Sequence, residues 1–265
     1  MATEFAGILN KRDDSILYAK LANDIRSAIV HKYLIPNTGR FDNATQAAQI
    51  FALWYNISPE KEKTFEVLLT EFERHNWHVS TGIFSTMMLF DLLREKDKNE
   101  LAYRIANQRD FPGWGYMLAN DATTLWESWE KPSSSSYNHP MFGSIDEWFY
   151  KSLLGINAGA PGFKKIIIKP QPALLTWAKG SYQSMYGLIE SDWKKEGNQF
   201  KLNVTIPVNT TAEIWLPATE KQVITENGNA SLQVSGIQLL KYQNGYAVFL
   251  AGSGRYNFVV DATQQ

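Results

Sequence analysis

The stretch "NAGAPGFKKIIIKPQP", residues 157–172, separates two halves of the chain that have different hydrophobic periods. Before this stretch, apolar residues recur at the three- and four-residue spacing of amphipathic helices. After it, apolar and polar residues alternate between turn signals, as they do in half-buried strands. The change of period predicts an α+β chain of two domains, an α-helical domain at residues 1–157 and an antiparallel β-sandwich domain at residues 158–265.

The first half contains about six segments with helical periodicity. They are residues 13–30, 44–57, 58–76, 81–96, 98–109 and 140–156. Ser58 and Pro59 favour a helix start, because a serine side chain accepts a free backbone N–H and proline suits the first helical position. Three long loops rich in glycine, proline and aromatic residues connect these segments, and loops of this kind often carry functional sites.

The second half predicts short strands. Residues 164–172 form a strand that proline interrupts, and residues 181–217 alternate with turns at "KEGN" and "PVNT". Residues 245–260 predict a final hairpin around a glycine-rich turn. Short alternating strands at this spacing are typical of an antiparallel sandwich.

Composition excludes several classes of protein. The 265 residues carry a formal net charge of -1, so no basic surplus favours a nucleic acid partner. No apolar run approaches the roughly 20 residues that span a membrane, and the first residues lack the order of a signal peptide. The absence of cysteine excludes disulfides and thiol chemistry. None of these features identifies a cellular compartment.

The string "ATTLWESWE", residues 122–130, places Glu127 between Trp126 and Trp129. A carboxylate beside apolar walls suits a general acid or base, because its surroundings tune its pKa. The alternative is a surface glutamate next to tryptophans that only pack. Nine tryptophans are many for this length, and flat rings with a polar edge suit sugar ligands as well as a core.

Two histidines in the long loops raise the same choice. His139 and His78 each suit a hydrogen bond to a ligand hydroxyl or a structural role in a loop. His75 and His78 have the spacing of a metal pair, but no third ligand with a fitting spacing follows, so the sequence predicts no metal site.

Four ordered blocks resemble the C-terminal part of bacterial α-L-rhamnosidases. They are "HVSTGIFSTMMLFDLL", "ELAYRIANQRDFPGWGYMLANDATTLWESWE", "YNHPMFGSIDEWFYKSLLGI" and "PGFKKIIIKPQP". The resemblance extends from about residue 40 to the end of the chain. It implies the second half of an (α/α)6 barrel of twelve helices, followed by a β-sandwich, and the hydrolysis of terminal α-L-rhamnosyl bonds with inversion.

The resemblance also implies roles for individual residues. Glu127 matches the general base of the family, and Trp126 a wall of its pocket. His139 matches a histidine that contacts rhamnose, and Trp114 a tryptophan that stacks on the sugar. Ser128 stands where the family usually has arginine, so an ion pair made by that arginine is missing here.

The family's acidic, glycine-rich block with the general acid has no counterpart among these residues. We therefore expect the proton donor in a segment upstream of this chain. The reaction needs no cofactor, and its substrate is a rhamnose-containing glycoside. Two alternatives remain, namely a carbohydrate-binding protein without turnover and a half-barrel subunit that associates through the open side of its helices.

Overall fold

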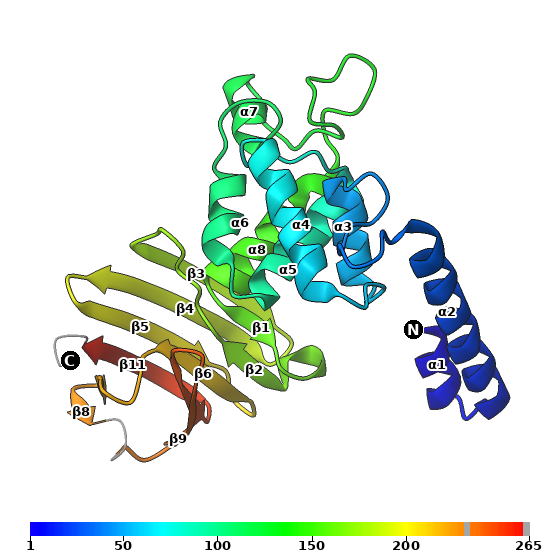
Figure 1. The fold of residues 1–265 in the computed structure, drawn as a ribbon. Coiled ribbons are helices and arrows are strands. Elements are labelled where there is room, and N and C mark those ends of the chain that lie inside the picture. The colour runs from blue at the N-terminus through cyan, green and yellow to red at the C-terminus, as the bar shows by residue number, and fades with distance from the viewer. Residues whose placement is uncertain (231–233, 262–265) are drawn as a thin grey trace. The chain divides into compact units, whose positions relative to one another are not determined.

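The computed structural model describes residues 1–230 and 234–261 (Figure 1). These residues form two compact units. The first comprises Met1–Leu92 and Arg104–Phe142, and the second comprises Leu93–Tyr103 and the chain from Gly143 onwards. The predicted boundary between residues 157 and 158 lies in the second unit, within the first strand (Ile156–Ala158), and stays a prediction about the domains.

The described residues contain eight α-helices, which are α1 (Ala2–Ile8), α2 (Arg12–Tyr33), α3 (Gln46–Trp54), α4 (Lys61–Arg74), α5 (Ile83–Glu95), α6 (Asn99–Ala106), α7 (Trp114–Ala119) and α8 (Ser144–Trp148). The six predicted segments correspond to α2–α6 and α8, while α1 and α7 were not predicted. The segment predicted as one helix at 140–156 is a 3₁₀ turn (Pro140–Gly143), α8 and a π-helix (Phe149–Leu153) in succession.

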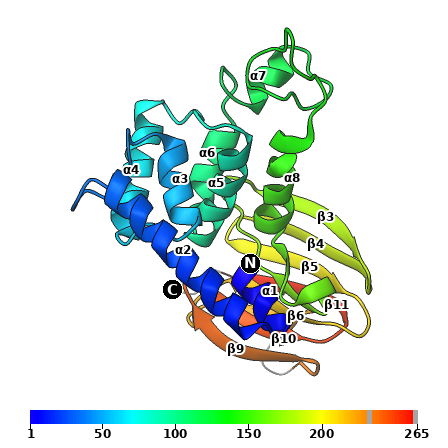
Figure 2. The ribbon, with the colours of Figure 1, turned by 90° about the vertical axis from the view of Figure 1, so that its right-hand side faces the viewer.

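The first two helices lie side by side as a helical hairpin (Figures 1 and 2). Hydrogen bonds at the turn join them, and Ala6 of α1 is buried. No residue of α2 is fully buried, and Leu17, Leu21 and Ile25 are 59%, 50% and 51% exposed. The hairpin therefore presents apolar side chains that its own two helices do not cover.

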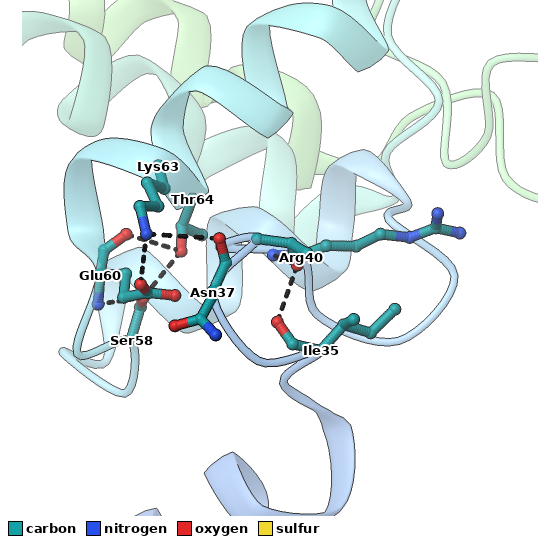
Figure 3. A network of polar contacts seen from close by, with 8 residues as sticks. Ile35, Asn37, Arg40, Ser58, Glu60, Lys63 and Thr64 are labelled. Atoms are coloured by element: carbon teal, nitrogen blue, oxygen red, sulfur yellow. Dashed lines mark hydrogen bonds and ion pairs between the residues drawn. The ribbon is translucent and has the colours of Figure 1, made fainter.

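Helix α4 begins at Lys61, three residues after the serine that the sequence suggested as its cap. Ser58 still accepts a hydrogen bond from the Glu60 N–H at 3.1 Å, and its Oγ lies 2.7 Å from the Thr64 hydroxyl. Lys63 pairs with Glu60 at 2.6 Å and donates to the Asn37 carbonyl (Figure 3). This network holds the loop before α3 against the start of α4.

Two sheets form the sandwich of the second unit. The first sheet has the order β1-β2-β6-β10-β9, and the second has the order β3-β4-β5-β11-β7-β8. The strands are β1 (Ile156–Ala158), β2 (Lys165–Ile168), β3 (Trp177–Ser184), β4 (Gly187–Glu196), β5 (Gln199–Ile206), β6 (Thr211–Pro217), β7 (Val223–Glu226), β8 (Asn229–Ala230), β9 (Ile237–Gln243), β10 (Tyr246–Ala251) and β11 (Gly254–Asp261).

The pairing between described strands is antiparallel except for β2 with β6, which is parallel. Alternation places one side of each sheet in a shared core that includes Trp193, Leu202, Ile214, Phe249 and Phe258, each at most 1% exposed. Burial of such apolar surface stabilises the sandwich by roughly 25 cal/mol per Å². The predicted fold class, helices followed by a sandwich, is confirmed.

The predicted hairpin at residues 245–260 is wrong. Strand β10 pairs with β6 and β9, whereas β11 pairs with β5 and β7 in the other sheet. The turn between them crosses from one sheet to the other. Both strands bury apolar side chains in the same core, so alternation alone could not distinguish a hairpin from a crossing between sheets.

In the part of the chain that the structure describes, none of the helices is long and apolar enough to cross a membrane.

Candidate functional site

The tryptophan-rich loop of residues 120–139 folds back on itself. The Glu127 N–H donates to the Ser136 carbonyl at 3.0 Å, and the His139 N–H donates to the Leu125 carbonyl at 2.9 Å. The Thr124 hydroxyl donates to the Tyr137 carbonyl. These bonds lay residues 124–127 alongside residues 136–139, and we call this arrangement the loop clip. The clip fixes Glu127 and His139 in one piece of backbone.

Glu127 is exposed, and its carboxylate is oriented by the clip. Its Oε2 accepts a hydrogen bond from the Ser136 N–H at 2.8 Å. Among residues 1–230 and 234–261, none donates a hydrogen bond to its Oε1. The side chain is therefore held at one oxygen and open at the other, as a base that receives a proton from water requires.

His139 is half-buried in the same clip. The Met141 N–H donates to its Nδ1 at 3.3 Å, so Nδ1 acts as an acceptor. A neutral imidazole with an accepting Nδ1 carries its proton on Nε2. His139 can therefore offer an Nε2–H to a ligand hydroxyl.

Trp126 lies beneath the clip and is 1% exposed. It packs with Met117 and Phe142 in a small core cluster, and its ring meets Tyr116 and Tyr137 edge-on. The buried indole of Trp126 thus anchors the backbone next to Glu127 in this core cluster. Direct contact with a sugar would need exposure that the described structure does not show for this ring.

Trp114 opens α7 and is 8% exposed. Its Nε1–H donates to the Phe142 carbonyl at 3.1 Å, and its ring contacts Phe90 and Trp129 edge-on. Gly115 allows α7 to approach the preceding loop, since a Cβ there would lie 2.3 Å from the Gln108 carbonyl oxygen. Trp114 is mainly a packing residue in this conformation, and its proposed stacking on sugar stays a prediction.

A cavity of about 650 Å³ lies between the loops at residues 75–82 and 110–112. Trp129 lines it with a half-buried indole that stacks on Phe142 and donates from Nε1 to the Thr81 carbonyl at 2.7 Å. Phe111 and Pro112 add apolar surface on the other side. An aromatic wall with a few polar groups is the usual composition of a small-molecule site.

His78 and Asp110 join the two loops across this cavity. The His78 Nε2 lies 2.7 Å from the Asp110 Oδ1, and the His78 Nδ1 lies 3.1 Å from the His75 carbonyl oxygen. The hydrogen bond from His78 is the main cause that lowers the pKa of Asp110 below its ordinary value, with a smaller contribution from its own backbone N–H. The carboxylate is therefore held in its ionised form.

The sequence indicated both loops as candidate sites, but it indicated neither Asp110 nor the position of Trp129 in the cavity wall. Asp110 lies 32 residues from His78 and carries no local pattern that marks it. Among the residues that the structure describes, no group of three or more histidine, cysteine, aspartate or glutamate side chains is arranged to hold a metal ion.

The comparisons with known proteins place this order of helices and a following sandwich among the glycosidases. Residues 1–153 match the model of the bacterial alpha-L-rhamnosidase 6 hairpin glycosidase domain, and residues 155–231 match that of the C-terminal domain of these proteins. This chain belongs to the bacterial α-L-rhamnosidase family.

Curated relatives agree with this assignment. An alpha-L-rhamnosidase of Streptomyces avermitilis is 31% identical over 98% of this chain, and one of Formosa agariphila is 28% identical over 97%. The matches span 25% and 29% of those relatives' lengths. The chain therefore covers about a quarter of the proteins that it resembles.

Solved structures give the same result. The alpha-L-rhamnosidase of Dictyoglumus thermophilum superposes with a TM-score of 0.87 at 35% identity, over 98% of this chain and 30% of that chain. The Streptomyces avermitilis enzyme complexed with L-rhamnose superposes with a TM-score of 0.87 at 31% identity, over 98% and 25%.

Proposed function

We propose that this chain supplies the base side of an active site that hydrolyses terminal α-L-rhamnosyl bonds with inversion. The observation that carries the proposal is the loop clip, which includes both Glu127 and His139 and holds one carboxylate oxygen of Glu127 through the Ser136 N–H. Family membership and the rhamnose complex of the Streptomyces relative support the choice of sugar.

In the proposed reaction, Glu127 Oε1 takes a proton from a water molecule as the water oxygen bonds to the anomeric carbon. The bond from that carbon to the leaving oxygen breaks on the opposite face, so the configuration inverts. Inverting enzymes hold their two carboxyl groups about 6.5–9.5 Å apart to make room for this water. We place the second carboxyl group, which protonates the leaving oxygen, in the part of the relatives that this chain does not match.

His139 is proposed to bind the rhamnosyl ring through its Nε2–H. Trp126 is proposed to act from the core side, by keeping Glu127 in position, and Trp114 is proposed to stack on the sugar, as its match to the family implies. None of these roles needs a cofactor, because the reaction transfers only protons and a glycosyl group.

The test is Glu127→Gln in a protein completed with the remaining part of the catalytic domain. Loss of a general base should lower kcat by about 10²- to 10⁴-fold with a smaller effect on KM. Glu130→Gln is the matched control, because Glu130 is an exposed glutamate three residues along the same loop. An unchanged kcat in Glu127→Gln would refute the role of this residue.

The second candidate is a carbohydrate-binding half-site without turnover. The aromatic cavity favours it, because such a cavity binds sugar whether or not an acid is present. Isothermal titration with L-rhamnose together with an aryl rhamnoside assay on the completed protein distinguishes the two. Binding without hydrolysis supports the second candidate, and hydrolysis supports the first.

A further inference from the structure

Strands β3, β4, β5 and β11 of the six-stranded sheet lie side by side (Figure 2). Alternate residues of these strands, such as Trp193, Leu202 and Phe258, lie in the shared core. The residues between them lie on the opposite side of the sheet, which we call the outer face. Strand pairing aligns the outer-face residues in rows across the four strands, and one row is Lys179, Asp192, Asn203 and Asn257. These side chains are all polar.

A hollow of about 530 Å³ lies over this row and the next one. The second row is Ser181, Glu190, Thr205 and Arg255. The charged side chains that line the hollow are two cations and two anions, namely Lys179, Arg255, Glu190 and Asp192. Lys179 also pairs with Asp192 at 3.6 Å. Because the charges balance, the hollow selects neither an acidic nor a basic partner, and it suits a neutral ligand.

The polar groups of the hollow orient one another and keep capacity for a ligand. The Asn257 Nδ2 donates to the Asn203 Oδ1 at 2.7 Å, and the Thr205 hydroxyl donates to the Glu190 Oε2 at 2.7 Å. In the described part of the chain, no group bonds the Asn203 Nδ2 or the Asn257 Oδ1. A donor and an acceptor thus lie next to each other on a fixed sheet. Neighbouring sugar hydroxyls match this pair, since each hydroxyl both donates and accepts.

Trp177 adds a flat apolar surface beside the hollow. It precedes Lys179 by two residues on β3, so it lies on the same face, and it is 62% exposed. The strand register places Asp192 diagonally across from it, within reach of a long side chain. Trp177 and Asn203 lie two strands apart, which is about 10 Å at the usual strand spacing. One pyranose ring does not span that distance, so a sugar that contacts both residues has at least two rings.

We propose that the outer face of β3, β4, β5 and β11 binds a neutral oligosaccharide chain. Trp177 stacks on the C–H groups of one ring, and the pair of Asn203 and Asn257 bonds neighbouring hydroxyl groups of another. This function is additional to the proposed hydrolysis and does not depend on Glu127, because every residue of the site lies in the sandwich. It gives the protein a second point of attachment to a carbohydrate polymer.

The test titrates the 265-residue chain calorimetrically with three neutral tetrasaccharides, cellotetraose, xylotetraose and mannotetraose. At least one of them should bind, and its monosaccharide should bind about tenfold more weakly or less, because one ring reaches only part of the site. Trp177→Ala should weaken binding of that tetrasaccharide by about tenfold through the lost ring contact. Asn203→Ala should weaken it by about 3- to 10-fold, the scale of one hydrogen bond.

Gln238→Ala and Leu240→Ala are the matched controls, because both residues are exposed on β9 of the other sheet. They should leave tetrasaccharide binding unchanged. The melting temperature of all four variants should stay near that of the unsubstituted chain, since each replaced side chain is exposed.

Failure of all three tetrasaccharides to bind the unsubstituted chain would overturn the proposal. Binding that neither Trp177→Ala nor Asn203→Ala weakens would also overturn it, because the sugar then lies elsewhere. If no sugar binds and Trp177→Ala lowers a concentration-dependent mass in light scattering, the outer face is a protein interface instead. None of these results bears on Glu127, whose role is decided by kcat of the completed protein.

Discussion

The pKa of the Glu196 side chain lies well below the ordinary value for a glutamate. It lies at the end of β4, where Lys194 and Lys201 both donate to its carboxylate, Lys201 at 2.6 Å. The hydrogen bonds from Lys194 and then Lys201 lower the pKa of Glu196 from its ordinary value of 4.5 to about 2. The group thus stays ionised at pH values where a carboxyl group with the ordinary pKa of glutamate is neutral.

A carboxyl titration by NMR should show this low pKa for Glu196, and Lys201→Met should raise it toward 4.5. Because the folded pKa is depressed, the stabilisation that this group contributes is present above pH 4.5 and disappears as the pH falls toward about 2. Added salt should reduce the shift, since all three side chains of the cluster reach the solvent. A Glu196 that titrates near 4.5 in the unsubstituted chain contradicts this interpretation.

His139 permits a test of the sugar site that does not disturb the fold. His139→Ala should weaken L-rhamnose binding by about 1 to 3 kcal/mol, the scale of one ligand hydrogen bond. The melting temperature should change little, because the one hydrogen bond that the described residues make to this side chain is a 3.3 Å bond from the Met141 N–H. His31→Ala, on the exposed end of α2, is the control. A large loss of stability with unchanged affinity would indicate a structural role.

At the scale of elements, α7 depends on one close approach of backbone to backbone. Gly115→Ala should destabilise the protein by about 1 to 3 kcal/mol, because the added Cβ would meet the Gln108 carbonyl oxygen at 2.3 Å. Helix propensity alone predicts the opposite sign, since alanine favours helix more than glycine. The midpoint of urea unfolding measures the difference.

Gly82→Ala is the control for that measurement. Gly82 precedes α5, and a Cβ there would have no atom within 4 Å. The free energy of unfolding of the Gly82→Ala variant should stay within about 0.5 kcal/mol of the value for the unsubstituted chain. Equal effects of the two substitutions would show that the contact at Gln108 does not constrain α7.

Periodicity predicted the long helices and most of the strands, because each of these elements buries one face. It missed α1 and α7, which have only seven and six residues and so offer too few turns for a period. The sequence also predicted Glu127 and His139 as site residues, which stays a prediction. It could not show that backbone hydrogen bonds join the two segments that carry them, because those bonds depend on how residues 128–135 turn.

The sequence could not predict contacts between distant segments, for the same reason. The pairing of His78 with Asp110 spans 32 residues, and the crossing of β10 and β11 between sheets depends on the whole sandwich. No pattern within a short window encodes either one. Resemblance to the family implied the barrel-like arrangement of the helices and the role that we propose for Glu127, but it did not indicate Asp110.

At the scale of the whole molecule, we predict that the chain associates through the helical hairpin of α1 and α2. Leu17, Leu21 and Ile25 of α2 are each at least half exposed, and apolar patches of this kind favour association or aggregation. Light scattering should show a mass that rises with concentration. Leu21→Lys with Ile25→Lys should lower it toward the 30.1 kDa of one chain.

The control for that measurement is Leu118→Lys, which changes a 71% exposed leucine at the end of α7. It should leave the mass of the associated form unchanged. A monodisperse monomer at all concentrations of the unsubstituted chain would refute association through α2. The same sample should not hydrolyse an alkyl rhamnoside, since we place the proton donor outside these residues.

The loop clip separates the reacting part of its loop from the tip. Bonds between residues 124–127 and 136–139 close the base of the loop, and Ser133 and Ser134 at the tip are exposed. Lengthening a closed loop costs little, about 0.6 kcal/mol for each doubling. The serine tip is therefore a place where natural variants could gain residues, or where a fluorescent label could be attached, while the spacing of Glu127 and His139 is preserved.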